Sequence, residues 1–263
     1  MKIVRFTMAS WESYGILEGD KIHETTGNLD DFMQGTHTLT GATFNLNEVQ
    51  LLSPCLPGKV LCLGLNYRSH AEEVGLEIPQ EPILFMKPST SVIGHEEYIL
   101  YPPQSKRVDY EAELGVVIGE KCSGVKAEQA LKYVLGYCCS NDVTARDLQP
   151  KRGQWTYAKS FDTFCPVGPW VETRIENPDD LVIRGYLNHK QVQEGSTRDH
   201  IFTVPEIIEY ISKCMTLMAG DIILTGTPSG IGPMKSGDVF EVEIPAVGTL
   251  RNEIHDKAKV EQG

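Results

Sequence analysis

The chain has 263 residues, 41% of them hydrophobic and 23% charged, which is ordinary usage for a globular protein and excludes wholesale disorder. Its 36 Asp and Glu residues outnumber its 24 Lys and Arg residues, so the net charge is −12, and three consecutive basic residues occur nowhere. A surface this acidic repels phosphate backbones, so we expect no nucleic-acid partner.

The cellular setting follows from two further properties of the sequence. No apolar stretch approaches the roughly 20 residues that cross a bilayer, and the first residues lack the apolar core and cleavage site of a signal peptide. The seven cysteines include no CxxC pair, which argues against a disulfide framework and for a reducing compartment. We therefore expect a cytoplasmic protein with no membrane partner.

The first half of the chain is rich in strand and turn signals. Residues 1–55 alternate short strands with turns and end at the Pro- and Gly-containing segment 53–58, which predicts a small N-terminal β-rich module. An apolar strand is expected at 59–64 and another at 82–86. Between them, the polar segment 66–74 stops at Gly75, a typical helix end.

The second half contains the clearest predicted helix, residues 203–217. Thr203 and Glu206 form a capping box, and apolar residues recur at the helical period on one face: Ile207, Ile208, Ile211, Cys214 and Met215. A shorter helix is expected at 127–133, and strands at 181–187, 221–225 and 239–244. This pattern predicts a mixed, β-rich fold with few helices, in which residues 56–257 form the main domain and residues 258–263 a polar tail.

The segment 108–119 carries the most chemical information. As one strand it would place apolar residues at even positions on one face, and Asp109, Glu111 and Glu113 on the other. The Cα atoms of Glu111 and Glu113 would then lie roughly 6.6 Å apart, close enough for the carboxylates to repel unless a cation or protons intervene. A solvated strand face is the alternative, but the apolar face and the glycines of this strand favour the interior.

A third carboxylate, Asp142, ends the largely apolar run 135–142. Three carboxylates without a paired histidine or cysteine suit a hard cation such as Mg²⁺ or Mn²⁺, whereas zinc favours nitrogen and sulfur ligands. We therefore predict that Glu111, Glu113 and Asp142 bind Mg²⁺ or Mn²⁺.

With these residues in view, the sequence resembles the fumarylacetoacetate hydrolase family. The resemblance rests on five blocks in the family order, between about residues 58 and 245: 64–73, 109–119, 141–147, 159–166 and 224–232. It implies the family's C-terminal-domain β-sandwich roll, assembly as a homodimer, and Mg²⁺ or Mn²⁺ at the site, with Glu111, Glu113 and Asp142 at the positions of the metal ligands.

The resemblance also implies roles for other residues. His70 and Glu73 match the catalytic acid–base dyad of the acylpyruvate hydrolase and oxaloacetate decarboxylase branch, on a segment that orders over the site when substrate binds. Lys159 and Gln149 match polar catalytic residues around the substrate or a catalytic water. Two residues match substrate-binding positions. Arg146 matches one of the polar positions around the substrate, and Thr227 matches a position that contacts the substrate carboxylate.

Elementary chemistry supports the roles implied for His70 and Glu73 and for the basic residues Lys159 and Arg146. On a helix, His70 and Glu73 would share a face, and the carboxylate would orient the imidazole and raise its basicity; an exposed histidine beside glutamates is the alternative. Lys159 and Arg146 would offset the negative site for an anionic substrate. No role is assigned to the other histidines, and the tryptophans are expected to serve packing.

Three hypotheses for the function remain open. The first is metal-dependent cleavage of a C–C bond in a small 2,4-dioxo or 2-oxo dicarboxylic acid through a metal-stabilised enolate, as in acylpyruvate hydrolysis or oxaloacetate decarboxylation. The second is proton transfer only, as in a 2-hydroxyhepta-2,4-diene-1,7-dioate isomerase or tautomerase. The third is a catalytically silent metal-binding paralogue, against which the joint presence of His70, Glu73, Lys159 and Gln149 argues.

Overall fold

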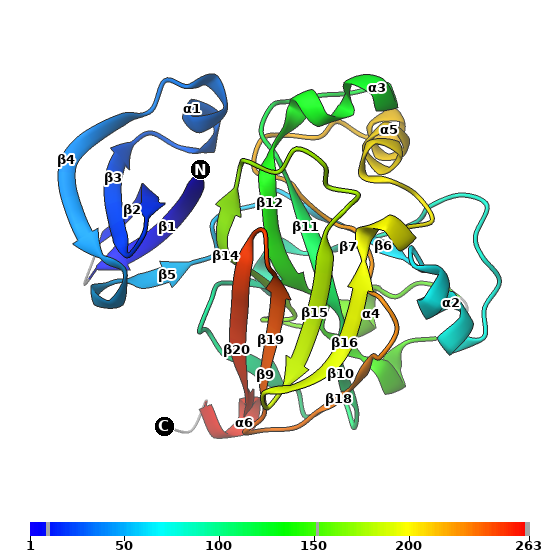
Figure 1. Ribbon diagram of the computed structural model, residues 1–263. Helices are drawn as coiled ribbons and strands as arrows, with labels where there is room; N and C mark the ends of the chain where they lie inside the picture. The colour runs from blue at the N-terminus through cyan, green and yellow to red at the C-terminus, as the bar shows by residue number, and fades with distance from the viewer. Residues whose placement is uncertain (9–10, 151–152, 261–263) are drawn as a thin grey trace.

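The computed structural model of the chain describes residues 1–8, 11–150 and 153–260 (Figure 1). The N-terminal segment consists, in chain order, of β1 (Lys2–Met8), β2 (Trp11–Glu18), β3 (Lys21–Thr26), α1 (Leu29–Gln34), β4 (Thr38–Asn45), the 3₁₀ turn η1 (Leu46–Glu48) and β5 (Gln50–Leu52). These strands form the curved sheet beside the larger body of the molecule in Figure 1.

The larger body begins with the elements that surround the acidic residues. They are β6 (Val60–Gly64), α2 (Arg68–Val74), β7 (Ile83–Lys87), η2 (Ser89–Ser91), β8 (Val92–Ile93), β9 (Ile99–Tyr101), β10 (Val108–Tyr110), β11 (Ala112–Ile118), α3 (Ala127–Ala130), η3 (Leu131–Tyr133), β12 (Val134–Asn141), β13 (Thr144–Ala145), η4 (Arg146–Leu148) and α4 (Thr156–Lys159).

The remaining elements complete the sheets and add the longest helix. They are β14 (Cys165–Glu172), β15 (Val182–Leu187), β16 (Lys190–Ser196), η5 (Thr197–Asp199), α5 (Val204–Cys214), β17 (Ile222–Leu224), β18 (Gly232–Met234), β19 (Val239–Ile244), β20 (Gly248–Asp256) and α6 (Lys257–Val260). In none of these described ranges is there a helix of the length and apolarity needed to cross a bilayer.

Three sheets organise the described residues. The largest runs β4-β3-β2-β1-β14-β12-β11-β17-β6-β7, with β5 and β8 attached at β1 and β14. A five-stranded sheet, β16-β15-β19-β20-β9, lies in front of β11, β12 and β14 (Figure 1). A small sheet, β13-β10-β18, lies at one end of this sandwich. Apolar side chains from the two larger sheets and α5 fill the space between them, which is the main core.

The N-terminal strands join the large sheet directly. β1 pairs with β2 on one side and with β14 on the other, where Lys2 faces Glu172 and Ile3 faces Val171. The N-terminal ammonium also binds the Glu172 carboxylate at 2.8 Å. One continuous sheet therefore crosses the expected domain boundary at residues 55 and 56, and the boundary itself stays a prediction.

The expectation of a β-rich fold with few helices is confirmed, and so are most of the element positions. Helix α2 ends where expected, with Gly75 in the left-handed conformation at φ 67°. Strand β19 has the predicted bounds, and the weak helix after residue 127 is one α-helical turn, α3, followed by the 3₁₀ turn η3.

Three local predictions need correction. Helix α5 has the Thr203–Glu206 capping box, but it ends at Cys214 instead of residue 217, because Met215 adopts an extended conformation. The Cys214 side chain is exposed and so lies off the buried face. The polar tail is partly structured: residues 257–260 form α6, directly after β20, whereas residues 261–263 lie outside the described residues.

The acidic strand is interrupted at Glu111. β10 belongs to the small sheet, whereas β11 belongs to the large one, so the chain changes sheets between them. Every residue of β11 is buried, on both faces. Asp109 therefore does not continue the face of Glu111 and Glu113, and its carboxylate binds Arg107 and Arg146 instead.

Candidate active site

Glu111, Glu113 and Asp142 converge in the interior of the protein. One carboxylate oxygen of each lies within 4.8 Å of those of the other two, and all three side chains are buried. Strand pairing brings them together: Ala112 faces Asn141 in the β11–β12 ladder. The Glu111 N–H donates to Asn141 Oδ1 at 2.9 Å, and the Asp142 N–H donates to the Glu111 carbonyl at 2.9 Å.

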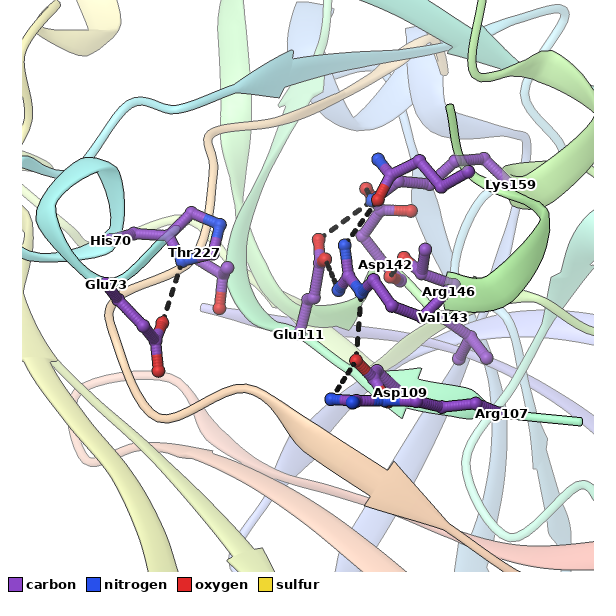
Figure 2. Close-up of polar contacts among 12 residues, drawn as sticks. His70, Glu73, Arg107, Asp109, Glu111, Asp142, Val143, Arg146, Lys159 and Thr227 are labelled. Carbon is purple, nitrogen blue, oxygen red and sulfur yellow. Dashed lines mark hydrogen bonds and ion pairs between the residues drawn. The ribbon is translucent and has the colours of Figure 1, made fainter. Parts of the chain in front are cut away.

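Two basic side chains, Lys159 and Arg146, bind Glu111 of this carboxylate cluster, as Figure 2 shows. Lys159, at the end of α4, donates from Nζ to Glu111 Oε2 at 2.8 Å and to Asp142 Oδ2 at 2.6 Å. Arg146, in η4, binds the other Glu111 oxygen, donates to Asp109 at 2.9 Å and donates to Gln149 Oε1 at 2.5 Å. The two cations thus hold Glu111 from both sides.

The pKa values of Glu111 and Glu113 are shifted in opposite directions. Burial by itself raises the pKa of the Glu111 carboxyl, but the positive charges of Lys159 and Arg146 outweigh it and hold that pKa well below its usual range. Burial raises the pKa of Glu113 well above its usual range, and the negative charges of Asp142 and Glu111 raise it further. Without a divalent metal ion at the cluster, Glu113 is therefore the carboxyl of the two glutamates that holds a proton more strongly.

The residues fit a hard divalent ion. The cluster offers carboxylate oxygens from three residues on or next to the paired strands β11 and β12, and the pKa of Glu113 is raised by burial and by the neighbouring negative charges, which a divalent ion would neutralise. Glu111, Glu113 and Asp142 would hold the ion, as the sequence predicts, with the remaining positions filled by water or substrate oxygens.

His70 and Glu73 lie across the site from the carboxylate cluster (Figure 2). Both lie on α2, where His70 Nδ1 is 3.0 Å from Glu73 Oε2, and the His70 side chain is buried (Figure 2). The second Glu73 oxygen accepts a hydrogen bond from the Gly230 N–H at 2.9 Å. Glu73 therefore fixes the imidazole and attaches α2 to the loop before β18.

A cavity of about 380 Å³ joins the two walls. It is lined by polar residues from both, namely His70, Glu111, Glu113, Arg146, Gln149, Lys159 and Thr227. Its apolar lining includes Phe85 and Trp155, so Trp155 does more than the packing expected from the sequence. The cavity thus brings together most of the site residues predicted from the sequence. Asp142 and Glu73 do not line it, but they bind Lys159 and His70, which do.

Thr227 lies at the cavity wall with its hydroxyl already engaged. Its Oγ1 donates to the Ala112 carbonyl at 2.9 Å and accepts from Gln193 Nε2 at 2.9 Å. Gln193, on β16, also donates to the Pro228 carbonyl at 2.9 Å and accepts from the Ala112 N–H at 3.0 Å. This buried amide connects the backbone between the two glutamates with the Thr227 loop, and the sequence analysis missed it.

A second missed residue is Lys87, at the end of β7. Its side chain is fully buried, and its Nζ binds Asp142 Oδ1 and donates to the Val143 carbonyl at 3.0 Å. Asp142 thus has a lysine on each oxygen, Lys87 on one and Lys159 on the other. The sequence signal was a lysine ending an apolar strand and followed by proline, which by itself has no functional meaning.

Comparison with known proteins places these features in a family. Residues 59–255 match the C-terminal domain of fumarylacetoacetate (FAA) hydrolases, and residues 1–54 match a domain described as Rv2993c-like, N-terminal. The chain is 41% identical to oxaloacetate tautomerase YisK of Bacillus subtilis over an alignment of 254 residues that covers 91% of this chain and 84% of that protein.

Two further similarities cover nearly the whole chain. The 2,4-didehydro-3-deoxy-L-rhamnonate hydrolase of a Sphingomonas species is 38% identical over 97% of this chain and 96% of its own. The crystal structure of 2-hydroxyhepta-2,4-diene-1,7-dioate isomerase from Mycobacterium marinum superposes with a TM-score of 0.89 at 39% identity, over 98% of this chain and 99% of that one. The relatives share the fold and differ in their named reactions.

Proposed function

The chain belongs to the fumarylacetoacetate hydrolase family, and on that premise we propose that it is a divalent-metal-dependent enzyme that hydrolyses the C3–C4 bond of a small 2,4-dioxo acid. One observation supports this most strongly: the three-carboxylate cluster and the His70–Glu73 pair lie on opposite walls of one cavity. The family includes proteins named as hydrolase, tautomerase and isomerase.

The metal site in this proposal consists of Glu111, Glu113 and Asp142. When bound, Mg²⁺ or Mn²⁺ would supply Lewis-acid stabilisation of the negative charge that develops on the 2-oxo group as the C–C bond breaks. Lys159 and Arg146 keep positive charge beside an otherwise anionic cluster, which favours an anionic substrate. Gln149, bound to Arg146, presents its amide to the same cavity.

The dyad supplies the proton transfers. With Nδ1–H donating to Glu73, the His70 Nε2 carries a lone pair and can take a proton from water as the water oxygen bonds to C4. The electron pair of the C3–C4 bond remains on C3 as the enolate of pyruvate, which takes up the proton. Water and the 2,4-dioxo acid thus give pyruvate and a carboxylic acid.

A second candidate uses the same residues without bond cleavage. Proton transfer between C3 and the 2-oxo oxygen would make the protein a tautomerase or isomerase, and the relatives named oxaloacetate tautomerase and 2-hydroxyhepta-2,4-diene-1,7-dioate isomerase favour it. Decarboxylation of oxaloacetate is the variant in which CO₂ leaves from C3 and no water adds.

The products separate these candidates. The purified protein is incubated with Mg²⁺ or with EDTA and given acetylpyruvate, oxaloacetate or a 2-hydroxy-diene dioate. Metal-dependent release of pyruvate and acetate supports hydrolysis, and release of pyruvate and CO₂ from oxaloacetate alone supports decarboxylation. A spectral change of the diene without fragmentation would replace hydrolysis by isomerisation. Glu111→Ala and Asp142→Ala should abolish the metal-dependent activity, and undiminished turnover would refute the metal site.

Two properties expected from the sequence are part of the proposal. The family resemblance suggests a homodimer, and the cysteine usage suggests a cytoplasmic protein. Light scattering during gel filtration measures the first, since a dimer has twice the 29.2 kDa mass of one chain. Fractionation of the source cells tests the second.

A further inference from the structure

The loop that joins β17 to β18, residues 225–231, contains two glycines with positive φ angles, Gly226 at 96° and Gly230 at 101°. Residues with a side chain rarely adopt this conformation, so both positions favour glycine. Each glycine presents its backbone N–H to a carboxylate: Gly226 to Glu113 of the carboxylate cluster, and Gly230 to Glu73 of the dyad. One loop thus contacts both halves of the site.

The first contact holds a predicted metal ligand. The Gly226 N–H donates to Glu113 Oε2 at 2.6 Å, and both groups are buried. A backbone N–H bound to a carboxylate forms a short, charge-assisted hydrogen bond, which restricts rotation of the carboxylate about its own axis. A Cβ atom at residue 226 would lie 2.8 Å from Cβ of Asn66, so a side chain there would displace the loop or its neighbour.

The second contact holds the carboxylate of the dyad. The Gly230 N–H donates to Glu73 Oε1 at 2.9 Å, while His70 Nδ1 lies 3.0 Å from the other oxygen. This N–H therefore fixes the carboxylate that orients the imidazole. A Cβ atom at residue 230 would overlap the carbonyl oxygen of Val192, and because this is a backbone atom, the loop would have to move.

Between the two glycines, the loop is fixed to the rest of the protein. Thr227 Oγ1 donates to the Ala112 carbonyl at 2.9 Å. Gln193 Nε2 donates to Thr227 Oγ1 and to the Pro228 carbonyl, both at 2.9 Å. Pro228 also packs on β16, where a Cβ atom at Gly195 would lie 2.5 Å from the Pro228 Cβ. Because the middle of the loop is held, a change at one glycine should not reach the other.

We infer that Gly226 and Gly230 are positioning residues, whose backbone N–H groups fix the carboxylate of Glu113 and the carboxylate of Glu73 independently of each other. The inference rests on the proposed function for the roles of the two halves. Gly226 then determines how tightly the cluster binds a divalent ion, and Gly230 determines how well His70 is oriented toward the reacting water. A loop that only stabilised the fold would, when disturbed, change both properties together or neither.

Single alanine replacements separate the two ends. Gly226→Ala should lower the Mg²⁺ affinity, measured by calorimetric titration, about tenfold or more, because groups that orient metal ligands commonly contribute that much. Gly230→Ala should leave the Mg²⁺ affinity within about twofold but lower kcat for the cleaved dioxo acid about tenfold at unchanged KM. Equal Mg²⁺ affinities of the two variants, or an unchanged kcat in Gly230→Ala, would overturn the inference.

Gly237→Ala is the matched control. Gly237 also has a positive φ angle, 89°, and its N–H donates to the Ile254 carbonyl at 2.8 Å. A Cβ atom there would meet none of the described residues within 4 Å, so this variant reports backbone strain alone. Its Mg²⁺ affinity and kcat should both stay within about twofold of the wild type. Losses as large as those of the loop variants would assign them to strain and overturn the inference.

Amide signals test the two contacts in a protein that keeps both glycines. Two-dimensional ¹H–¹⁵N spectra of the metal-free protein, labelled with ¹⁵N-glycine, are compared for the wild type, Glu113→Gln and Glu73→Gln. The Gly226 signal should shift in Glu113→Gln alone and the Gly230 signal in Glu73→Gln alone, because each amide loses its charged acceptor in one variant only. A signal that shifts in neither variant, or equally in both, would overturn the inference.

This comparison needs neither metal nor substrate, so it separates the inference from the proposed function. If both signals respond as expected and no dioxo acid is cleaved, the proposed hydrolysis fails and the positioning roles stand. If a dioxo acid is cleaved and the Gly230 signal does not respond to Glu73→Gln, the positioning role fails and hydrolysis stands.

Discussion

Replacing Lys87 by Met tests the buried network behind Asp142. Met has nearly the length of Lys but no charge, so the change removes the ion pair to Asp142 and the hydrogen bond to the Val143 carbonyl, 3.0 Å in length, without opening a large cavity. Both partners are inaccessible to water: the side chains of Lys87 and Asp142 are 0% and 1% exposed. Breaking one half of such a buried pair costs about 3–5 kcal/mol of unfolding free energy, and we expect the lower end of this range because Asp142 keeps its ion pair with Lys159.

A divalent ion should change that cost. If Asp142 is a metal ligand, bound Mg²⁺ supplies positive charge to the carboxylate, and the remaining loss is mainly the hydrogen bond to Val143, about 1 kcal/mol. Urea unfolding of the wild type and of Lys87→Met, each in EDTA and in saturating Mg²⁺, measures the gap in unfolding free energy between the two proteins under both conditions. We expect the gap to narrow by about 2 kcal/mol or more when the ion is present.

Lys59→Met is the matched control. Lys59 binds the buried Asp221, neither residue lines the cavity, and the Lys59 side chain is 19% exposed. Asp221 also accepts hydrogen bonds from the N–H groups of Lys59 and Met218. The loss in this variant should therefore be smaller and the same with and without Mg²⁺. A gap for Lys87→Met that does not change with Mg²⁺ would refute the placement of Asp142 at the metal.

Three further predictions concern the site. Gln193→Leu should lower kcat/KM at least tenfold, because it frees the Thr227 loop and the backbone between the two glutamates. Gln191→Leu, which changes an exposed residue of the same strand, should leave kcat/KM within about twofold. Equal kinetics of the two variants would show that the Gln193 amide does not position the site. Mg²⁺ affinity should rise with pH, because burial and the neighbouring carboxylates raise the pKa of Glu113 and the ion must displace its proton. The affinity should level off once the pH exceeds that pKa. Calorimetry at several pH values measures it, and an affinity that does not change with pH would contradict this prediction. His70→Asn should slow hydrolysis of a dioxo acid at least a hundredfold but decarboxylation of oxaloacetate much less, because only hydrolysis requires an activated water. Equal losses in the two product assays would show that His70 does not act on the water.

The sequence predicted the parts of the site that are local in the chain. The spacing of Glu111 and Glu113 and the capping residues of α5 carry their information within a few positions, and the structure has them where the pattern indicated. It could not predict that the acidic strand changes sheets at Glu111, because Asp109 and Glu113 look alike in an alternating pattern. Only the partners of β10 and β11 distinguish them.

The residues missed by the sequence analysis all act through long-range contacts. Lys87 lies 55 positions from Asp142, and Gln193 lies 34 positions from Thr227. A lysine at the end of a strand and a glutamine in a polar strand are ordinary surface residues by pattern. Trp155 becomes a cavity residue because Gly64, at the end of β6, leaves room for its ring. Burial, which the pattern does not contain, gives these residues their roles.

The central claim is that water, activated by His70, adds to the C4 carbonyl while the C3–C4 bond breaks. Cleavage of acetylpyruvate in ¹⁸O-labelled water with Mg²⁺, followed by mass spectrometry of the acetate, tests it most directly. The account predicts one solvent oxygen in each acetate formed, release of acetate only when the metal is present, and loss of the reaction in Glu111→Ala. Intact acetylpyruvate that only exchanges its C3 protons with solvent would contradict hydrolysis and assign the site to tautomerisation.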